Sequence, residues 1–229
     1  MFRFVKRHYA LFVVLILIII VSSIYFNIVK SSAAKFNGIT IVLDAGHGGR
    51  DGGCVGINGS VEKDLNLKYS LRLKDKLVDR GYKVVLTRTN DDGLYSPLAT
   101  NKKVSDMNVR MEMIKKTNPN LVISVHMNSF ADKSVSGANC FYKIDDDASI
   151  KCANLIQKSL HKYCGVKSEN AKKGDYFMLN CSYYTSVLIE CGFLSNVEEE
   201  KKLNSDEYLE KFTSAVADAV FLYFGEGVV

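Results

Sequence analysis

Two histidines follow apolar runs in a way that suits metal binding. His47 comes soon after residues 39–44 and His126 directly after residues 121–125, and both runs have the β-rich composition of buried strands. Side chains at the ends of buried strands emerge into a crevice with a rigid backing, where α/β proteins bind ligands. The two histidines can therefore face one metal site, although two hydrogen-bonded loop histidines would give the same pattern.

Two glutamates can complete a hydrolytic centre around this pair. Catalytic zinc usually takes three protein ligands of histidine and carboxylate type and leaves one position for water. Glu62, in the first turn of the helix expected after a glycine-rich loop, can supply the third ligand. Glu190 ends the apolar run 187–189, where a carboxylate is costly unless it has a partner. Such a group can take a proton from metal-bound water, and the alternative is a salt-bridged structural glutamate.

Two aspartates near His47 have two roles open to them. Asp44 precedes the histidine at the end of the first apolar run, and Asp51 follows it in the glycine-rich loop. Either carboxylate can orient the imidazole, as the outer partners of metal ligands commonly do. Either can instead cap the loop backbone, so both interpretations stay open.

Nucleotide and nucleic-acid binding do not fit the sequence. Asp51 stands where the third glycine of a GxGxxG fingerprint belongs, and the chain has no GxxxxGK[ST] motif. The formal net charge is +5, from 30 Lys and Arg against 25 Asp and Glu. Residues 1–35 hold five of these bases and no acid, so the rest of the chain carries equal numbers of both signs. No excess of positive charge is left there to bind phosphates.

Apolar periodicity and glycine positions predict alternating strands and helices. Strands are expected at residues 39–44, 83–87, 121–125, 137–143 and 187–190. Helices are expected at residues 61–80, 105–117, 148–164 and 206–224, the first with Ser60 as its N-cap. Within the first helix, residues 65–73 also alternate as a strand would, but length and the Leu, Lys and Arg content favour a helix. Strands alternating with helices imply an α/β sheet with both faces covered.

Residues 9–29 carry no charge and are a candidate membrane segment. As a helix rising about 1.5 Å per residue they would span roughly 31 Å, close to the hydrocarbon thickness of a bilayer. Arg3, Lys6 and Arg7 precede the run, so the positive-inside tendency leaves the N-terminus in the cytoplasm and exports the remainder of the chain.

The length of this run favours an uncleaved anchor over a signal peptide. Residues 32–34, Ser-Ala-Ala, nevertheless resemble a cleavage site. We expect a signal or anchor segment at residues 1–35 and a catalytic domain at residues 36–229. The protein is then a single-pass protein of the cell membrane with an extracytoplasmic catalytic domain, or a secreted protein if the signal is cleaved.

The cysteines give no sign of a disulfide framework. They show no CxxC spacing, and a domain of this size needs no covalent crosslinks. We expect small buried side chains with free thiols. The six are Cys54, Cys140, Cys152, Cys164, Cys181 and Cys191.

Five segments in order resemble the zinc-dependent N-acetylmuramoyl-L-alanine amidases of the Amidase_3 type. They are LDAGHGGRDGG at 43–53, EKDLNL at 62–67, TRTND at 87–91, ISVHMNS at 123–129 and VLIECGFLSNVEE at 187–199. The resemblance implies a three-layer α/β fold, with a twisted, mostly parallel sheet of about six strands between helices, as in zinc exopeptidases. In this chain one N-terminal membrane helix would precede that fold.

The resemblance also implies a role for each candidate residue. His47, Glu62 and His126 match the Zn²⁺ ligands, and Glu190 matches the catalytic glutamate. The implied reaction is hydrolysis of the amide between N-acetylmuramic acid and L-alanine of the peptidoglycan stem peptide. A short chain with an anchor and no cell-wall-binding repeats is most similar to the spore-cortex amidases, whose action prepares muramic-δ-lactam formation. Family members are often gated by partner proteins, so an activator of unknown identity is a further expectation.

Two other functions share some of these features. One is a zinc peptidase or deacetylase of the cell wall with the same three ligands, and the other is a non-catalytic, membrane-tethered module that binds glycans. A binding module does not need a metal triad with an additional buried carboxylate. Cys54 and Asn139 depart from the residues expected at their positions in the family, alanine and glutamate, which puts substrate contacts in doubt but leaves the reaction class intact.

Overall fold

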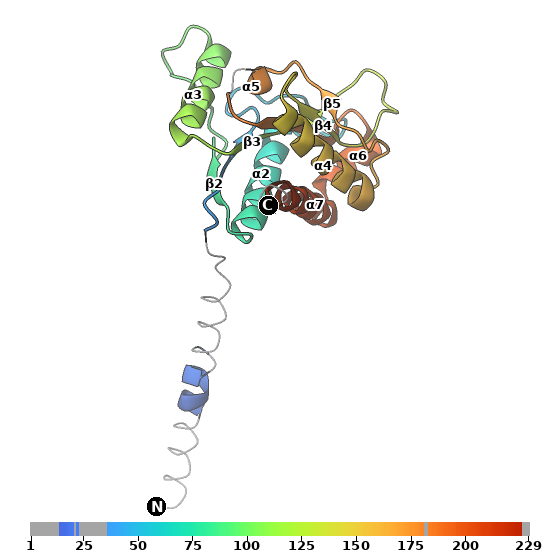
Figure 1. Cartoon of the computed structure of the whole chain (residues 1–229). Coiled ribbons are helices and arrows are strands. Elements are labelled where there is room, and N and C mark those ends of the chain that lie inside the picture. The colour runs from blue at the N-terminus through green and yellow to red at the C-terminus, as the bar shows by residue number, and fades with distance from the viewer. Residues whose placement is uncertain (1–13, 21, 23–35, 181–182, 226–229) are drawn as a thin grey trace, which may run out of the picture. The chain divides into compact units, whose positions relative to one another are not determined.

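The computed structural model describes residues 14–20, 22, 36–180 and 183–225 (Figure 1). Most of the predicted membrane segment, residues 9–29, lies outside these ranges, and residues 14–20 are helical. Among the described residues, no helix has the length and apolar character needed to cross a bilayer. The anchor and the division of the chain at residue 35 therefore stay predictions.

One sheet of six strands runs through the part of the chain after residue 35, in the order β2-β1-β3-β6-β4-β5 (Figure 1). Neighbouring strands are parallel except β4 and β6, which are antiparallel. The six strands are β1 (Thr40–Ala45), β2 (Lys83–Leu86), β3 (Leu121–Asn128), β4 (Asn139–Tyr142), β5 (Lys172–Lys173) and β6 (Ser186–Phe193). The mostly parallel sheet confirms the predicted three-layer α/β class.

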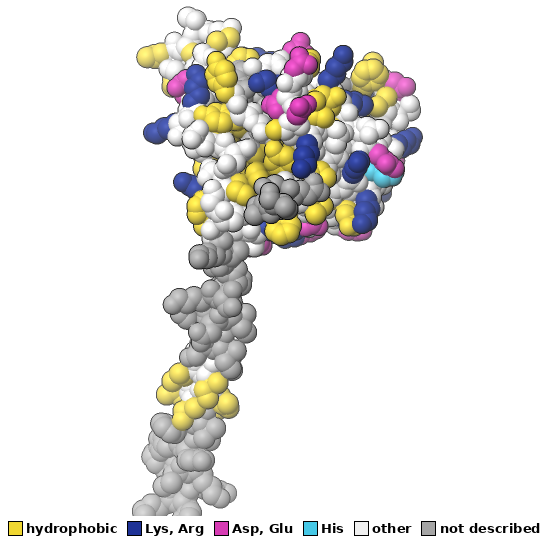
Figure 2. All heavy atoms as spheres, viewed as in Figure 1, with side chains coloured by type: hydrophobic (Ala, Val, Ile, Leu, Met, Phe, Trp, Pro, Cys, Tyr) yellow, Lys and Arg dark blue, Asp and Glu magenta, His cyan; other side chains and the backbone are white. Residues whose placement is uncertain are grey.

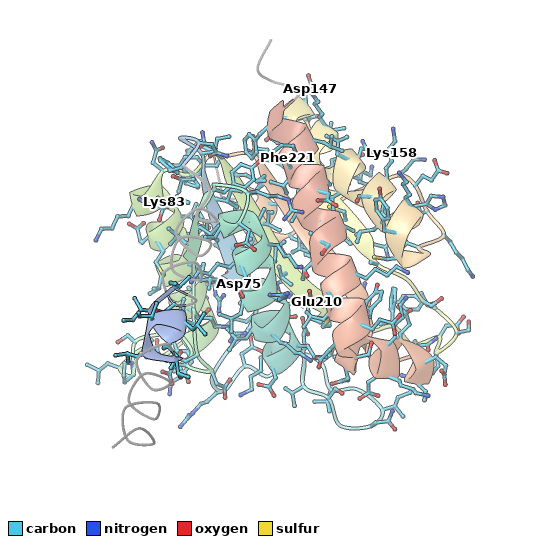
Figure 3. The ribbon with its side chains drawn as sticks, turned by 90° about the horizontal axis from the view of Figure 1, so that it is seen from below. Asp75, Lys83, Asp147, Lys158, Glu210 and Phe221 are labelled. Atoms are coloured by element: carbon cyan, nitrogen blue, oxygen red, sulfur yellow. The ribbon has the colours of Figure 1, made fainter. Side chains whose placement is uncertain are left out.

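Helices cover both faces of this sheet. On one face α7 (Asp206–Gly225) packs between α2 (Glu62–Val78) and α4 (Asp147–Cys164). Figure 3 shows these three helices side by side. On the other face, α3 (Lys102–Thr117) packs on β1 and the short α5 (Phe177–Asn180) packs on β6. The remaining helix, α6 (Val197–Asn204), contacts β6 and α7.

Successive side chains of the central strands point to opposite faces of the sheet, so the large core lies on one face and the site on the other. In β3, Ile123 and Val125 belong to the core under α2, α4 and α7, whereas Val122 packs beside α3 and α5. His126 lies an even number of residues from Val122 and therefore faces the α3 and α5 side. Glu190 pairs with His126 in the register of β3 and β6, so the two side chains share that face.

Several predicted boundaries were wrong in an informative way. Ser60 does not cap α2, whose N-cap is Val61 without a side-chain bond; the Ser60 N–H donates instead to Glu200. α3 begins at Lys102 because Asn101 accepts a hydrogen bond from the backbone of Val104. β3 continues to Asn128, so His126 lies within the strand and not after it.

The distribution of charge and the burial of the cysteines agree with what the sequence predicts. On the face drawn in Figure 2, basic side chains are interspersed with acidic ones. The five described cysteines are free, and four of them are buried. Cys181 lies outside the described residues.

Candidate metal centre and active site

The three predicted metal ligands converge on one point. Glu62 Oε1 lies 3.2 Å from Nε2 of His47 and 3.0 Å from Nδ1 of His126. One donor atom from each residue can be chosen so that all lie within 4.8 Å of one another. The two imidazole rings meet edge to face, with centroids 5.1 Å apart. This is the donor set and spacing that a divalent cation with three protein ligands requires.

The backbone around His47 allows this close approach. His47 itself has a φ of 61°, a left-handed conformation that few side chains adopt without support. Gly46 packs against the ring of His126, and a Cβ atom there would lie 2.2 Å from the ring. A side chain at position 46 would therefore displace the second histidine from the site.

Glu62 is held as an ionised carboxylate by donors from three segments. Its Oε2 accepts a hydrogen bond of 2.8 Å from the Cys54 backbone, and its Oε1 accepts one of 3.2 Å from the Met127 backbone. Burial raises the pKa of Glu62, but contacts with both histidines outweigh it and hold the pKa far below the usual range. An oxygen that two imidazoles and a backbone N–H share is a place where positive charge is stabilised. The three residues therefore fit a bound cation.

Asp51 combines the two roles that the sequence left open. Its Oδ1 lies 2.9 Å from Nδ1 of His47, and the same oxygen accepts a hydrogen bond from the Gly53 backbone. The contact with His47 is close but poorly aligned, so Nδ1 has no well-formed hydrogen bond among the described residues. Because Nε2 of His47 faces Glu62, Asp51 lies at the ring nitrogen away from the candidate metal position.

Asp44 takes neither of those roles. It is buried and accepts hydrogen bonds from Thr87, Ser124 and Arg110, at 2.9, 2.7 and 2.7 Å. Burial raises the pKa of Asp44, but the Arg110 charge and these hydrogen bonds outweigh it and hold the pKa below its ordinary value. Asp44 is thus one half of a fully buried ion pair beneath the site.

Two arginines that the sequence did not single out hold the backbone of the first histidine. Arg110 donates to the carbonyl oxygens of Ala45 and His47 at 2.8 and 2.6 Å. Arg88 donates to those of Ala45 and Gly46 at 2.9 and 3.0 Å. Together the two guanidinium groups bond every carbonyl from position 45 to 47. One signal was present, because a buried acid such as Asp44 requires a cation.

Glu190 is the buried carboxylate with a free oxygen at this site. It is 8% exposed, and its Oε2 has no hydrogen-bond partner within the described chain. Burial raises the pKa of Glu190 to about 7, and the charge of Glu62 adds to the effect while the two histidines oppose it. A carboxyl group whose pKa is close to 7 can both accept and release a proton at physiological pH.

These four residues share a cavity of about 580 Å³. Its floor is formed by the carboxyl ends of β1, β3 and β6, which carry or precede the site residues. One wall comes from α3, including Lys102 and Met107, and another from the segment of α5, including Phe177 and Met178. A polymer-bound amide can therefore reach the candidate metal position from solvent.

Comparison with known proteins points to one family. Residues 41–221 match the Amidase_3 family, described as N-acetylmuramoyl-L-alanine amidase, and this range contains all four site residues. A germination-specific N-acetylmuramoyl-L-alanine amidase of Bacillus subtilis strain 168 is 34% identical over 203 residues, which cover 86% of this chain and 84% of that protein.

Solved structures give the same result. The CwlD amidase from Clostridioides difficile, in complex with the GerS lipoprotein, superposes with a TM-score of 0.79 at 34% identity, covering 82% of this chain and 99% of that one. The catalytic domain of CwlV, an N-acetylmuramoyl-L-alanine amidase from Bacillus (Paenibacillus) polymyxa var. colistinus, superposes with a TM-score of 0.71 at 28% identity. It covers 82% of this chain and 98% of that domain.

Proposed function

The chain belongs to the Amidase_3 family and is an N-acetylmuramoyl-L-alanine amidase, and from this premise we propose how its residues perform the hydrolysis. We propose that Zn²⁺ binds His47, Glu62 and His126 and that Glu190 is the catalytic proton carrier. The observation that carries this proposal is the shared Glu62 oxygen, 3.2 and 3.0 Å from the two histidine nitrogens, with Glu190 in the same cavity.

The bound metal would supply a water of lowered pKa and a positive charge opposite the developing oxyanion of the scissile carbonyl. Glu190 then accepts the proton of the attacking water through its free oxygen. It returns that proton to the alanine nitrogen as the amide bond breaks, because an amine leaves readily only when protonated. A cation held by His47, Glu62 and His126 would lower the pKa of Glu190 from its raised value and favour the base form in which the cycle begins.

We further propose that the substrate is peptidoglycan of the spore cortex, where removal of the peptide prepares muramic-δ-lactam formation. The support is the similarity to a germination-specific amidase over most of both chains. Digests of cortex from a strain that lacks the protein should contain no muramic-δ-lactam, whereas vegetative walls should be unaffected.

Location and partner are part of the same proposal. The uncharged residues 9–29 would hold the protein in the cell membrane with residues 36–229 outside, or direct its secretion if the segment is cleaved. The relative from Clostridioides difficile forms a complex with a lipoprotein, and we propose that this chain also takes a protein activator. Protease added to protoplasts should degrade the catalytic part if this orientation is right.

Product analysis with the full chain tests the proposed chemistry. Purified peptidoglycan should release stem peptides that begin with free L-alanine, and a chelator should abolish the release until zinc is restored. Release of acetate would indicate a deacetylase, a cut within the peptide would indicate a peptidase, and binding without products would indicate a glycan-binding module.

Substitution of the two kinds of site residue separates their roles. Glu190→Gln should keep stoichiometric zinc and lose turnover by about 10²-fold or more, the usual scale of acid–base catalysis. His126→Ala should lose both zinc and activity. A Glu190→Gln enzyme with near-normal turnover, or a His126→Ala protein with full zinc content, would contradict the assignment.

A further inference from the structure

Three cations on the cavity wall have no acidic partner among the described residues. Of the basic side chains that line the cavity, Arg110 is paired with Asp44 and Asp106. In the part of the chain that the structure describes, no carboxylate lies within ion-pair distance of the other three. These are Arg50, Lys102 and Lys103. The accessible part of the wall therefore carries three cations that form no ion pair with the described residues.

Helix stability does not explain the two lysines. They occupy the first turn of α3, which contains no acidic residue. Positive charge in a first turn opposes the helix dipole, which favours negative charge there. The helix N-terminus is already completed by Asn101, whose side chain accepts from the Val104 backbone. The lysines therefore do not stabilise the start of α3.

Tyr95 joins the two segments that carry these cations. Lys102 Nζ lies 5.3 Å from the centre of the Tyr95 ring. The hydroxyl of Tyr95 reaches Gly49, next to Arg50, because a Cβ atom at Gly49 would lie 3.2 Å from it. The segments that carry Arg50 and Lys102 therefore meet at Tyr95 on the rim of the cavity, although more than fifty residues separate them in sequence.

The rim lies close to the candidate metal position. Asp51 lines the same cavity as the three cations. Asp51 in turn contacts Nδ1 of His47 at 2.9 Å. An anionic group one residue away from the scissile amide can therefore reach these cations.

The stem peptide supplies such a group on one side of the scissile bond. The residue after L-alanine is a γ-linked glutamyl residue, whose α-carboxyl group is either free or amidated. We propose that Arg50, Lys102 and Lys103 bind this free carboxylate, so that the peptide lies along α3 and the enzyme prefers a free carboxylate over the carboxamide. The inference rests on the proposed function of the neighbouring metal centre.

The opposite wall fits the other side of the bond. It presents apolar side chains of Tyr176, Met178 and Leu188 near Glu190, and no cation from α5 lines it. The N-acetylmuramoyl group carries no charge once its lactyl carboxyl is in the amide, so this wall suits it. The two walls therefore impose one direction on the substrate.

The test compares two synthetic muramyl peptides that differ only in a free or amidated glutamyl carboxyl. We expect the full-chain enzyme, loaded with zinc, to cleave the free acid with a kcat/KM about tenfold higher, mostly through KM, since a charge-assisted contact of modest strength gives this ratio. Arg50→Gln/Lys102→Gln/Lys103→Gln should lower the value for the free acid to that of the amide.

A matched control lies at the other end of the same helix. Lys115→Gln/Lys116→Gln removes two basic residues from the last turn of α3, outside the cavity lining, and should keep the preference. Equal cleavage of both peptides by the wild-type chain overturns the inference, as does a triple variant that keeps the preference or loses activity equally on both substrates.

A binding measurement separates this inference from the proposed function. Calorimetry with L-alanyl-γ-D-glutamate and its amide needs no turnover. Stronger binding of the free acid by the wild type, lost in the triple variant, supports the carboxylate site even if no cleavage occurs. Equal weak binding of both dipeptides by both proteins overturns it even if the enzyme is an active amidase.

Discussion

The position of His47 depends on hydrogen bonds that other residues make to its backbone. Its left-handed backbone is held from below by Arg110, which bonds its carbonyl oxygen at 2.6 Å. The same guanidinium is paired with Asp44 and bonded to Asp106 at 2.5 Å, so it cannot move independently of β1. Arg110 is thus a positioning residue, which acts on the candidate metal through the backbone of a ligand.

Arg110→Lys should therefore weaken zinc binding more than it changes the fold. A lysine keeps the charge but loses the planar fork that serves Asp44 and the two carbonyls at once. Loss of an outer partner of a metal ligand typically costs 10–100-fold in metal affinity, and we expect about that loss. Competition with a chromogenic chelator measures the affinity, and the d–d spectrum of the cobalt-substituted protein reports the ligand geometry.

The control for this variant is Arg72→Lys, at an exposed arginine of α2 that bonds Glu210 far from the site. It should leave zinc affinity and the cobalt spectrum unchanged. If Arg110→Lys has wild-type affinity and spectrum, its contacts with the loop do not position His47.

Acid stability should report the buried ion pair. The pKa of Asp44 is below its ordinary value of 3.8, so in acid the unfolded chain binds a proton more readily than the folded one. The stability contributed by the pair is fully present above that ordinary value and is lost as pH falls through the folded pKa. Urea unfolding of wild type from pH 7 down to pH 3 should show a steeper final decline than Asp44→Asn. Parallel pH curves would contradict the assignment.

Sequence reasoning singled out the residues proposed to do the chemistry, but not those that hold them in place. The histidines and Glu190 stand out because their types are unusual at strand ends and after an apolar run, and Glu62 stands out in the first helical turn after the glycine-rich loop. Arg88 and Arg110 act on backbone carbonyls, which every residue possesses, so no local pattern marks them. Only the topology shows that these side chains end beneath residues 45–47.

Two helices far apart in sequence form a regular contact at the scale of elements. Lys68 and Arg72 of α2, and Arg80 just after it, pair with residues of α7 at one constant separation of 138 positions. The pairs are Lys68–Asp206, Arg72–Glu210 and Arg80–Asp218. A constant offset means that the two helices run parallel. Figure 3 shows them side by side, with Asp75 on α2 and Glu210 on α7.

The buried aromatic contact between α2 and α7 should contribute more to the free energy of unfolding than the ion pairs at its surface. Phe212 is 2% exposed and stacks edge to face on Tyr69, with centroids 5.5 Å apart. Phe212→Ala should lower the free energy of unfolding by about 3–5 kcal/mol, because it leaves a cavity. Arg72→Gln should lower it by less than about 1 kcal/mol, as for exposed ion pairs. Urea denaturation of both variants measures the difference, and similar losses would refute this ranking.

Long helices and strands were predicted from the sequence, whereas the shortest ones were not. The long helices and the central strands have clear periods or apolar runs, and all of them are present. β5 with 2 residues and α5 with 4 residues are too short to show a period. α6 was also not predicted, because it has only 8 residues and begins shortly after β6. Its N-cap, Asn196, lies inside the segment that carries the family resemblance. The missed α5 carries one wall of the cavity, so the shape of the site required the structure.

At the scale of the molecule, the site is a product of strand order. β1 and β3 are neighbours in the sheet, although α2, β2 and α3 separate them in sequence. Their carboxyl ends therefore open at the same edge, beside that of β6, which is where parallel sheets bind ligands. The sequence predicted an α/β sheet and a shared site for residues 47, 126 and 190, but not the strand order that brings them into one cavity.

A metal bound by residues from the loop after β1, from α2 and from β3 should stabilise the whole catalytic part of the chain. His47, Glu62 and His126 are brought together only in the folded state, so zinc binds the native protein in preference to the unfolded one. At a free zinc concentration about 1,000 times the Kd, this linkage adds about 4 kcal/mol. For a domain of this size that corresponds to a rise in Tm of about 10 °C. Calorimetry of the full chain in chelator and in zinc measures the shift, and His126→Ala should abolish it. An equal rise in that variant would show that zinc stabilises the protein elsewhere.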